Sequence, residues 1–208
     1  MDPKYAQAST DLNLDGIAVL SHGVQRSGST WVWQILCDLY PPGAVLKTHN
    51  YLVLPDSIRV VSTYRDARDC AVSHWRQANP GRECMTLEEM FLYAGIYQHT
   101  FWVLSQYAER RSAALIRYED AIVDPGIIFR TVHHHLGVEV SPERQSEVLA
   151  AHSLETNKRH QDAGTGAEIN LIQNHIHEGE VGTWKRFVSD HGLLTELLEP
   201  QLKRWGYE

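Results

Sequence analysis

An apolar stretch that runs directly into a glycine-rich turn and a helix constrains the fold of this chain most strongly. Residues 16–24, GIAVLSHGV, predict a short buried strand, and Gly23 to Gly28 then form the pattern G-x-x-x-x-G. After this turn, apolar residues recur at every fourth position: Trp31, Ile35 and Leu39. A strand, a tight turn and a helix in direct succession predict an α/β fold with an anion site at the helix N-terminus.

Strands and helices continue to alternate along the chain. Further strands are expected over 44–48, 58–64 and 113–118. Helices are expected from Asp66, from Thr86 (a capping box with Glu89 and a staple of Met85 and Met90), from Asp124-Pro125 to Gly137, from Ser141-Pro142, and over 190–205. This order predicts a P-loop-like parallel sheet flanked by helices, a three-layer α/β/α architecture with ligands at the carboxyl ends of the strands.

Length and composition favour one globular domain. The 208 residues fit a single domain over 1–208, and 43% hydrophobic with 22% charged residues is typical of a globular protein. Residues 160–183 show no periodicity, so we expect a mobile loop or lid there. A formal net charge of −7 argues against general nucleic-acid binding, although a few local basic groups suffice for one small anion.

The N-terminal sequence and the cysteines bear on location. The stretch MDPKYAQASTDLNLDG lacks the apolar core of a secretory signal, and no apolar run approaches the ~20 residues that cross a bilayer. Cys37, Cys70 and Cys84 are far apart and odd in number, which suits a reduced compartment. We therefore expect a cytoplasmic protein that has no membrane segment.

The glycine-rich turn departs from an ATP-binding loop at one position. The P-loop pattern places lysine before the terminal Ser or Thr, but Ser29 stands there, and the basic residue of the turn is Arg26. The missing lysine argues against triphosphate hydrolysis. Arg26 and the hydroxyls of Ser27, Ser29 and Thr30 still suit an anion. A plain turn that caps a helix is the alternative.

Two further polar groups follow predicted strands. Lys47 and His49 lie two positions apart and so face the same side of a strand; histidine suits a general base, and lysine a phosphate-like leaving group. Arg65 ends the next strand, and Ser73 lies about two helical turns beyond Asp66, so both are placed to bind one phosphate. The alternatives are a surface triplet for 47–49 and an Arg65 that pairs with a nearby aspartate.

Five segments together resemble one enzyme family. They are QRSGSTW (25–31), LKTH (46–49), YRDARDCAVS (64–73), IRYEDAIVDP (116–125) and HEGEVGTWKRFV (177–188). In this order they resemble motifs of the sulfotransferases that use 3′-phosphoadenylyl sulfate (PAPS), namely PKSGTTW, K-T-H, R-(seven residues)-S, YEDLxxDP and RKGxxGDWKxxF. The resemblance covers roughly residues 17–188 and implies the α/β fold already predicted from periodicity.

The resemblance implies a nucleotide site. The 5′-phosphosulfate would be held by Arg26, Ser27, Gly28, Ser29 and Thr30. Trp31 would pack beside the adenine, and Tyr118 would contact another part of the nucleotide. Arg65 and Ser73 would bind the 3′-phosphate.

The resemblance also implies a reaction that needs no metal. His49 would take the proton of a hydroxyl on a small-molecule or glycan acceptor, while Lys47 and Arg26 offset the charge growing on the departing phosphate of the product PAP. The alternatives are a P-loop kinase or NTPase, and a non-catalytic nucleotide-binding protein on the same scaffold. The K-T-H segment argues against both.

The chain departs from the family pattern at two places. Arginine replaces the loop lysine at Arg26, and His177-Glu178-Gly179 replaces the Arg-Lys-Gly that grips the 3′-phosphate. Substitute cations for the second site are Lys158, Arg159, Lys185 and Arg186. The dimerisation motif of the animal enzymes is not visible after Trp184, so the oligomeric state stays open.

Several other features receive a structural interpretation. His133, His134 and His135 would spread around a helix rather than bind metal, and His175 with His177 lacks partners at ligand spacing. Arg68 and Asp69 are expected at the surface or as capping groups. One helix is rich in aromatic residues that core packing mostly explains, with one or two available for an acceptor pocket: Phe91, Tyr93, Tyr97, Phe101, Trp102 and Tyr107.

Overall fold

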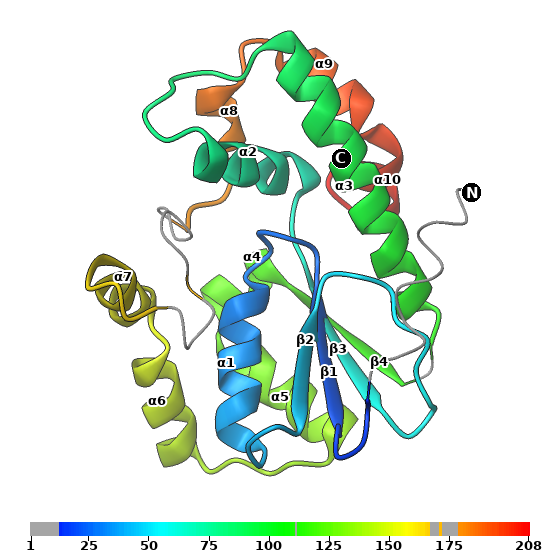
Figure 1. The fold of residues 1–208 in the computed structure, drawn as a ribbon, viewed down its shortest axis with the longest axis vertical. Coiled ribbons are helices and arrows are strands. Elements are labelled where there is room, and N and C mark those ends of the chain that lie inside the picture. Colours follow the sequence, from blue (N-terminus) through cyan, green and yellow to red (C-terminus); the bar gives the residue numbers. More distant parts are fainter. Residues whose placement is uncertain (1–12, 111, 167–170, 172–178) are drawn as a thin grey trace.

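A parallel sheet forms the centre of the molecule (Figure 1). The computed structural model describes residues 13–110, 112–166, 171 and 179–208. Within these residues the sheet has four strands in the order β2-β1-β3-β4. The strands are β1 (Val19–Gly23), β2 (Val45–Thr48), β3 (Arg59–Tyr64) and β4 (Ala113–Arg117). All three neighbouring pairs are parallel, which confirms the predicted sheet.

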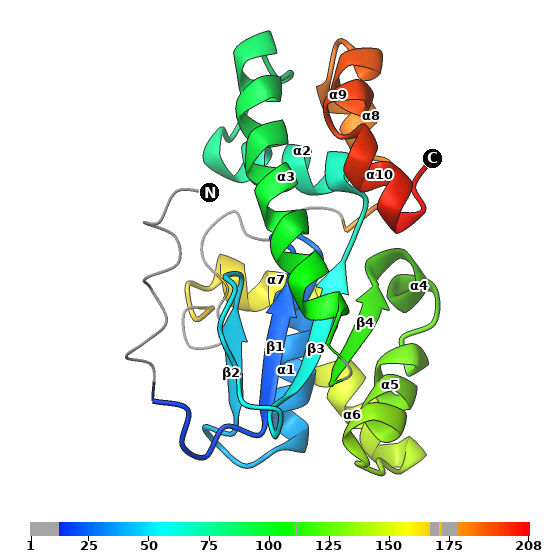
Figure 2. The same ribbon diagram turned by 90° about the vertical axis from the view of Figure 1, so that its right-hand side faces the viewer.

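Helices surround the sheet and extend beyond its carboxyl end. They are α1 (Ser29–Leu39), α2 (Ala67–Ala78), α3 (Leu87–Ala108), α4 (Tyr118–Val123), α5 (Gly126–Leu136), α6 (Pro142–Ala151), α7 (Leu154–Asp162), α8 (Trp184–Phe187), α9 (His191–Leu197) and α10 (Glu199–Trp205). Figure 2 shows α2, the upper part of α3 and the three C-terminal helices stacked above the strand ends.

Adjacent strand residues face opposite sides of the sheet, and both sides are covered. Val19 and Val61 pack in one apolar cluster with side chains of α1 and α5, whereas Leu20 and Val60 pack in another with Val103 of α3. Because successive side chains of a strand point in opposite directions, these neighbours reach different layers. The predicted three-layer arrangement is therefore confirmed.

The local signals for helix starts were accurate. The Asp66 side chain caps α2 by accepting a hydrogen bond from the Arg68 N–H, and Thr86 with Glu89 forms the full capping box of α3. Met85 and Met90 are both buried in the third apolar cluster, which joins α2 and α3 to the C-terminal helices. Gly137 ends α5 in the left-handed conformation, as predicted.

The structure differs from the sequence prediction in the C-terminal third. The helix expected over 190–205 is two helices, because Pro200 in the first turn of α10 cannot continue a preceding helix. The short helices α4 and α8 lack the length that gives a periodic signal, and α7 ends at Asp162, inside the expected loop. Part of that loop, residues 167–170 and 172–178, lies outside the described residues, so the mobile loop or lid stays a prediction. The assignment of one domain to residues 1–208 also stays a prediction.

Candidate functional site

A cavity of about 510 Å³ opens at the carboxyl end of the sheet. It receives residues that directly follow all four strands, as the parallel topology predicts. Nine of the predicted site residues line it: Arg26, Gly28, Ser29, Thr30, Trp31, His49, Arg65, Ser73 and Tyr118. Segments that are remote in sequence therefore meet around one hollow of the size of a small ligand.

The N-terminus of α1 faces this cavity through the glycine-rich turn. Gly28 is the N-cap residue, adopts a left-handed conformation with φ 79°, and makes no side-chain cap hydrogen bond. The first turn of α1 thus presents backbone N–H groups to the cavity without a competing side chain, which is the arrangement that binds anions. A Cβ on Gly28 would lie 2.8 Å from the Tyr118 ring, so the close approach also requires glycine.

Arg26 takes an unusual backbone conformation within the turn. It is the one non-glycine residue of the described chain with a positive φ, at 69°. Its Nε donates to Oγ of Ser73 at 3.0 Å, and its Nη1 donates to Oε1 of Gln77 at 3.3 Å. The turn therefore brings the Arg26 guanidinium into contact with α2. These side-chain contacts offset the strain in the left-handed backbone of Arg26.

Arg65 lies at the end of β3 with only part of its hydrogen-bonding capacity used. Its Nη2 donates to the Glu180 carbonyl at 2.5 Å and pairs with Asp69 at 3.4 Å. Its Nε is buried without a partner among the described residues. Burial opposes the charge of Arg65 and is the largest single influence, but the neighbouring groups together, Asp69 first among them, raise the pKa of Arg65 above its ordinary value. The expected alternative, an ion pair with a nearby aspartate, is thus present beside the cavity.

His49 is held in a defined tautomer. Its Nδ1 lies 2.7 Å from the Gly23 carbonyl, and since a carbonyl oxygen only accepts, Nδ1 carries the proton and Nε2 is the acceptor. Burial lowers the pKa of His49 below its ordinary 6.5. A neutral imidazole with Nε2 available is the form that a general base requires.

Lys47 reaches the cavity through a neighbour. Its Nζ donates to Oγ1 of Thr30 at 2.7 Å, and Thr30 itself lines the cavity. Burial lowers the pKa of Lys47 from 10.5 to about 8. The contacts of Lys47 with Thr30 and of His49 with Gly23 join the segment after β2 to the turn after β1, so these residues are more than a surface triplet.

Ser27 differs from the other residues of the turn. Its hydroxyl lies 2.6 Å from the Val24 carbonyl and 2.7 Å from Oγ1 of Thr63, and the side chain is buried. Ser27 is absent from the described lining of the cavity. The side chain therefore fastens the turn to β3 and does not reach the cavity, unlike the role expected from the resemblance.

Sequence reasoning missed several residues of the cavity wall. His74, Arg76 and Gln77 line it from α2, at the positions next to Ser73 and at i+3 and i+4 from it. Helical spacing from Ser73 was the signal that would have found the last two. Leu154 and Asn157 line it from α7, a polar helix that was not predicted from the sequence.

The electrostatics of the cavity oppose those of the whole chain. The formal net charge is −7, yet the described lining contains Arg26, Arg65 and Arg76 against the single carboxylate of Glu180. The four substitute cations considered from the sequence do not line it: Lys158, Arg159, Lys185 and Arg186. The site is therefore built for an anionic ligand, and Arg76 is the additional cation.

The C-terminal segment contributes backbone groups to the same wall. The Tyr118 hydroxyl donates to the Gly179 carbonyl at 2.7 Å, and Arg65 donates to that of Glu180. His175, His177 and Glu178 lie outside the described residues.

Neither a membrane-spanning helix nor a metal centre is found in the part of the chain that the structure describes. None of its helices is long and apolar enough to cross a bilayer, and it holds no cluster of three metal-ligating side chains. His133, His134 and His135 lie on α5, where His135 Nε2 contacts the Ser112 carbonyl at 2.8 Å.

Comparison with known proteins supports the sequence resemblance. The family described as "Sulfotransferase domain" matches residues 41–205, and no curated protein matches. The structure is similar to mouse sulfotransferase SULT7A1 complexed with PAP, with a TM-score of 0.67, 14% identity, and coverage of 94% of this chain and 86% of that one. Retinol dehydratase in complex with retinol and PAP gives a TM-score of 0.63 at 18% identity, with 89% and 81% covered.

A second retinol dehydratase structure, with androsterone and inactive cofactor PAP, gives a TM-score of 0.61 at 18% identity, with 89% and 79% covered. At identities of 14–18% these solved structures establish only the fold. The family is established by the match to the family model, which spans most of the chain. The family match begins after the glycine-rich turn, so the role of that turn depends on the geometry described above. On the family match, which spans residues 41–205, the chain belongs to the sulfotransferase family and is an enzyme of that family.

Proposed function

We propose that this sulfotransferase moves the sulfuryl group of PAPS to the hydroxyl of a small, largely apolar acceptor, with His49 as the general base. The observation that carries the proposal is the position of His49, which lines both the arginine-rich cavity and a second hollow of about 640 Å³. Proton transfer has to occur where donor and acceptor meet, so a base that lines both sites is suitably placed.

The arginine-rich cavity suits the nucleotide. Arg65, with its unpartnered Nε, and Ser73 are proposed to bind the 3′-phosphate. The N-terminus of α1 and Arg26 are proposed to hold the 5′-phosphosulfate. Trp31 and Tyr118, which also line the cavity, supply aromatic surface for the rest of the nucleotide.

The second hollow suits an apolar alcohol or phenol. Its described lining includes Phe91, Leu92 and Ile96 of α3 and contains no Lys, Arg, Asp or Glu. Phe91 and Leu92 are 53% and 60% exposed, so they are free to contact an acceptor. The mostly buried aromatics of α3, such as Tyr97 and Phe101, serve the core instead. A lining without acidic or strongly basic side chains, whose apolar part comes from Phe91, Leu92 and Ile96, favours a small molecule over a charged glycan.

In the proposed reaction the acceptor oxygen attacks sulfur while Nε2 of His49 takes the hydroxyl proton. The bond between sulfur and the phosphate oxygen breaks, and PAP leaves with the charge. The cationic side chains of Lys47 and Arg26 are already in place and stabilise this growing negative charge electrostatically, without proton transfer. Binding donor and acceptor in two hollows that His49 lines would supply the orientation that the reaction needs.

Two His49 variants test the base. In His49→Gln the side-chain amide keeps a donor for the Gly23 carbonyl but accepts no proton, and His49→Ala removes both functions. We expect each to lower kcat by about 10²–10⁴-fold while the PAP dissociation constant changes little. The assay follows PAP release with a panel of phenols and alcohols. A His49→Gln enzyme with wild-type kcat would refute the assignment.

Phe91→Ala tests the acceptor site. We expect it to raise the KM for an apolar acceptor about tenfold or more, because it removes a large contact surface, and to leave the KM for PAPS unchanged. Leu87→Ala is the matched control, since Leu87 is 56% exposed on the same helix but lines neither hollow. Equal effects of the two variants, or turnover of glycans only, would contradict the proposed acceptor class.

A thermal-shift comparison tests the nucleotide. Ligands that bind the native state raise the apparent Tm, so PAP and PAPS should raise it well above ADP or ATP at equal concentration. A larger shift with ATP and magnesium would favour the kinase alternative. The cytoplasmic location stays a prediction.

A further inference from the structure

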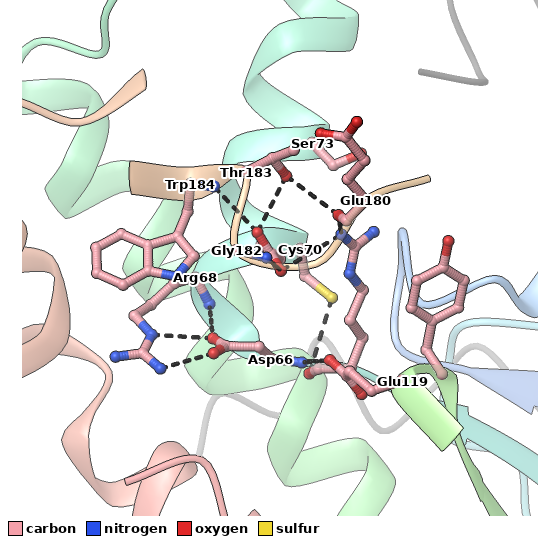
Figure 3. Close-up of polar contacts among 12 residues, drawn as sticks. Asp66, Arg68, Cys70, Ser73, Glu119, Glu180, Gly182, Thr183 and Trp184 are labelled. Atoms are coloured by element: carbon pink, nitrogen blue, oxygen red, sulfur yellow. Dashed lines mark hydrogen bonds and ion pairs between the residues drawn. The ribbon is translucent and has the colours of Figure 1, made fainter. Parts of the chain in front are cut away.

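Asp69 is a fully buried carboxylate that the reaction does not use. It lies in the first turn of α2, as the sequence predicted, but with 0% exposure, so the expectation of a surface position was wrong. Its oxygens accept hydrogen bonds from Gly182 N–H at 2.7 Å, Thr183 Oγ1 at 3.1 Å and Trp184 N–H at 3.0 Å. Figure 3 labels these three donors. One side chain thus fastens the segment 182–184 to α2, more than a hundred residues away in sequence.

The same carboxylate holds Arg65. The ion pair between them spans 3.4 Å, with side chains that are 7% and 0% exposed. Arg65 also donates to the Glu180 carbonyl and lies over the Tyr118 ring at 4.6 Å. Asp69 is therefore the common partner of a nucleotide-site arginine and of the C-terminal segment that forms one wall of the cavity through Glu180 and Thr183.

Burial makes these contacts depend on one another. A carboxylate without water is tolerable only when hydrogen bonds and an opposite charge satisfy it, and here both are present. Removing the carboxylate would leave the buried Trp184 N–H, the half-buried Gly182 N–H and the buried guanidinium of Arg65 without this partner. Asp69 is not among the described residues that line the cavity, so it acts through its neighbours and not as a ligand.

We propose that Asp69 is a positioning residue, which aims Arg65 at the 3′-phosphate and holds the backbone of 179–184 as a wall of the nucleotide cavity. The inference rests on the proposed function of that cavity. This chain lacks the family's Arg-Lys-Gly motif. In its place, the proposed nucleotide contacts come from Arg65 and from backbone groups that Asp69 anchors.

Electrostatics and positioning make opposite predictions for the removal of this carboxylate. A negative charge 3.4 Å from Arg65 weakens the attraction of that arginine for a phosphate, so charge alone predicts tighter PAP binding without it. Positioning predicts weaker binding, because Arg65 and the 179–184 wall lose their anchor. The sign of the change therefore tests the proposal directly.

The experiment uses Asp69→Asn, which keeps the shape and removes the charge. We expect the dissociation constant for PAP to rise about 10- to 100-fold, the equivalent of losing charge-assisted hydrogen bonds. ADP lacks the 3′-phosphate, so its affinity should change much less, and the preference for PAP over ADP should fall by a similar factor. A merely destabilised protein would keep that preference.

Two further variants keep the test decisive. Thr183→Val removes one hydrogen bond to the carboxylate without changing charge, and it should lower the PAP/ADP preference several-fold even if Asp69→Asn does not fold. Asp66→Asn is the control, because Asp66 pairs with Arg68 at 2.6 Å in the same helix turn and lies outside the described cavity lining. It should lower Tm without altering the preference.

Tighter PAP binding in folded Asp69→Asn, or an unchanged PAP/ADP preference in both Asp69→Asn and Thr183→Val, would overturn the positioning role. A wild-type protein that does not prefer PAP over ADP would instead refute the proposed function itself, and this inference with it. The two failures are therefore distinguishable in one titration series.

Discussion

His22 should make the protein sensitive to mild acid. It lies in β1 directly before Gly23 with 0% exposure. Its Nδ1 is 3.0 Å from Oγ of Ser62, its ring lies 4.5 Å from that of Tyr107, and its Nε2 has no partner among the described residues. Burial, with a smaller contribution from His49, lowers the pKa of His22 to about 3. The native state therefore resists a proton that the unfolded chain accepts readily.

The sign and size follow from linkage. An unfolded histidine titrates near 6.5, so the contribution of His22 to stability is fully present above that pH and is lost as pH falls from about 6.5 towards 3. Between pH 7 and pH 5 the free energy of unfolding should fall by about 2 kcal/mol from this one group. That is a large part of the 5–15 kcal/mol typical of a domain.

Urea denaturation at pH 7, 6 and 5 measures the effect, with His22→Asn as the comparison. Asparagine does not titrate. Between pH 7 and pH 5 the free energy of unfolding of the variant should therefore fall by about 2 kcal/mol less than that of the wild type, whatever the stability of the variant at pH 7. Contributions of His49 and His74, whose pKa values are also lowered mainly by burial, remain in both proteins and cancel. A difference below about 0.5 kcal/mol between the two pH responses, well under the 2 kcal/mol expected from linkage, would refute the reasoning.

Two other predictions concern the turn and the segment that faces it. Because burial lowers the pKa of Lys47 to about 8, kcat/KM for PAPS should decline as pH rises through about 8, and Lys47→Arg should remove that limb from the pH–rate profile. A limb that persists in the arginine variant would assign it to another group. Gly28→Ala should lower the free energy of unfolding by more than the ~1–2 kcal/mol of a left-handed residue and should weaken PAP binding, because its Cβ would meet Tyr118. Gly81→Ala, at φ 82° with open space around it, is the control that pays only the backbone cost, and equal Tm losses would count against the Tyr118 contact.

Much of the cavity was predictable because its residues follow strands. In a parallel sheet the strand ends share one edge, so Arg26, His49, Arg65 and Tyr118 had to approach one another once the strands were recognised. The caps at Asp66 and Thr86 were equally accessible, since a cap is a contact within three residues. These features depend on local sequence and on topology alone.

The surroundings of the Asp69, Ser27 and Arg76 side chains depend on tertiary contacts. The spacing of residues does not reveal that the carboxylate of Asp69 would be buried by a segment more than a hundred positions later, or that the hydroxyl of Ser27 would turn to Thr63. Burial and partner choice depend on what packs against a side chain, and such contacts join residues far apart in sequence. From the sequence we could predict the sheet, the glycine-rich turn before α1 and a histidine directly after β2, because these follow from local patterns and from strand order. Which arginines line the cavity, and which carboxylate pairs with Arg65, depends on contacts between remote segments that form only on folding.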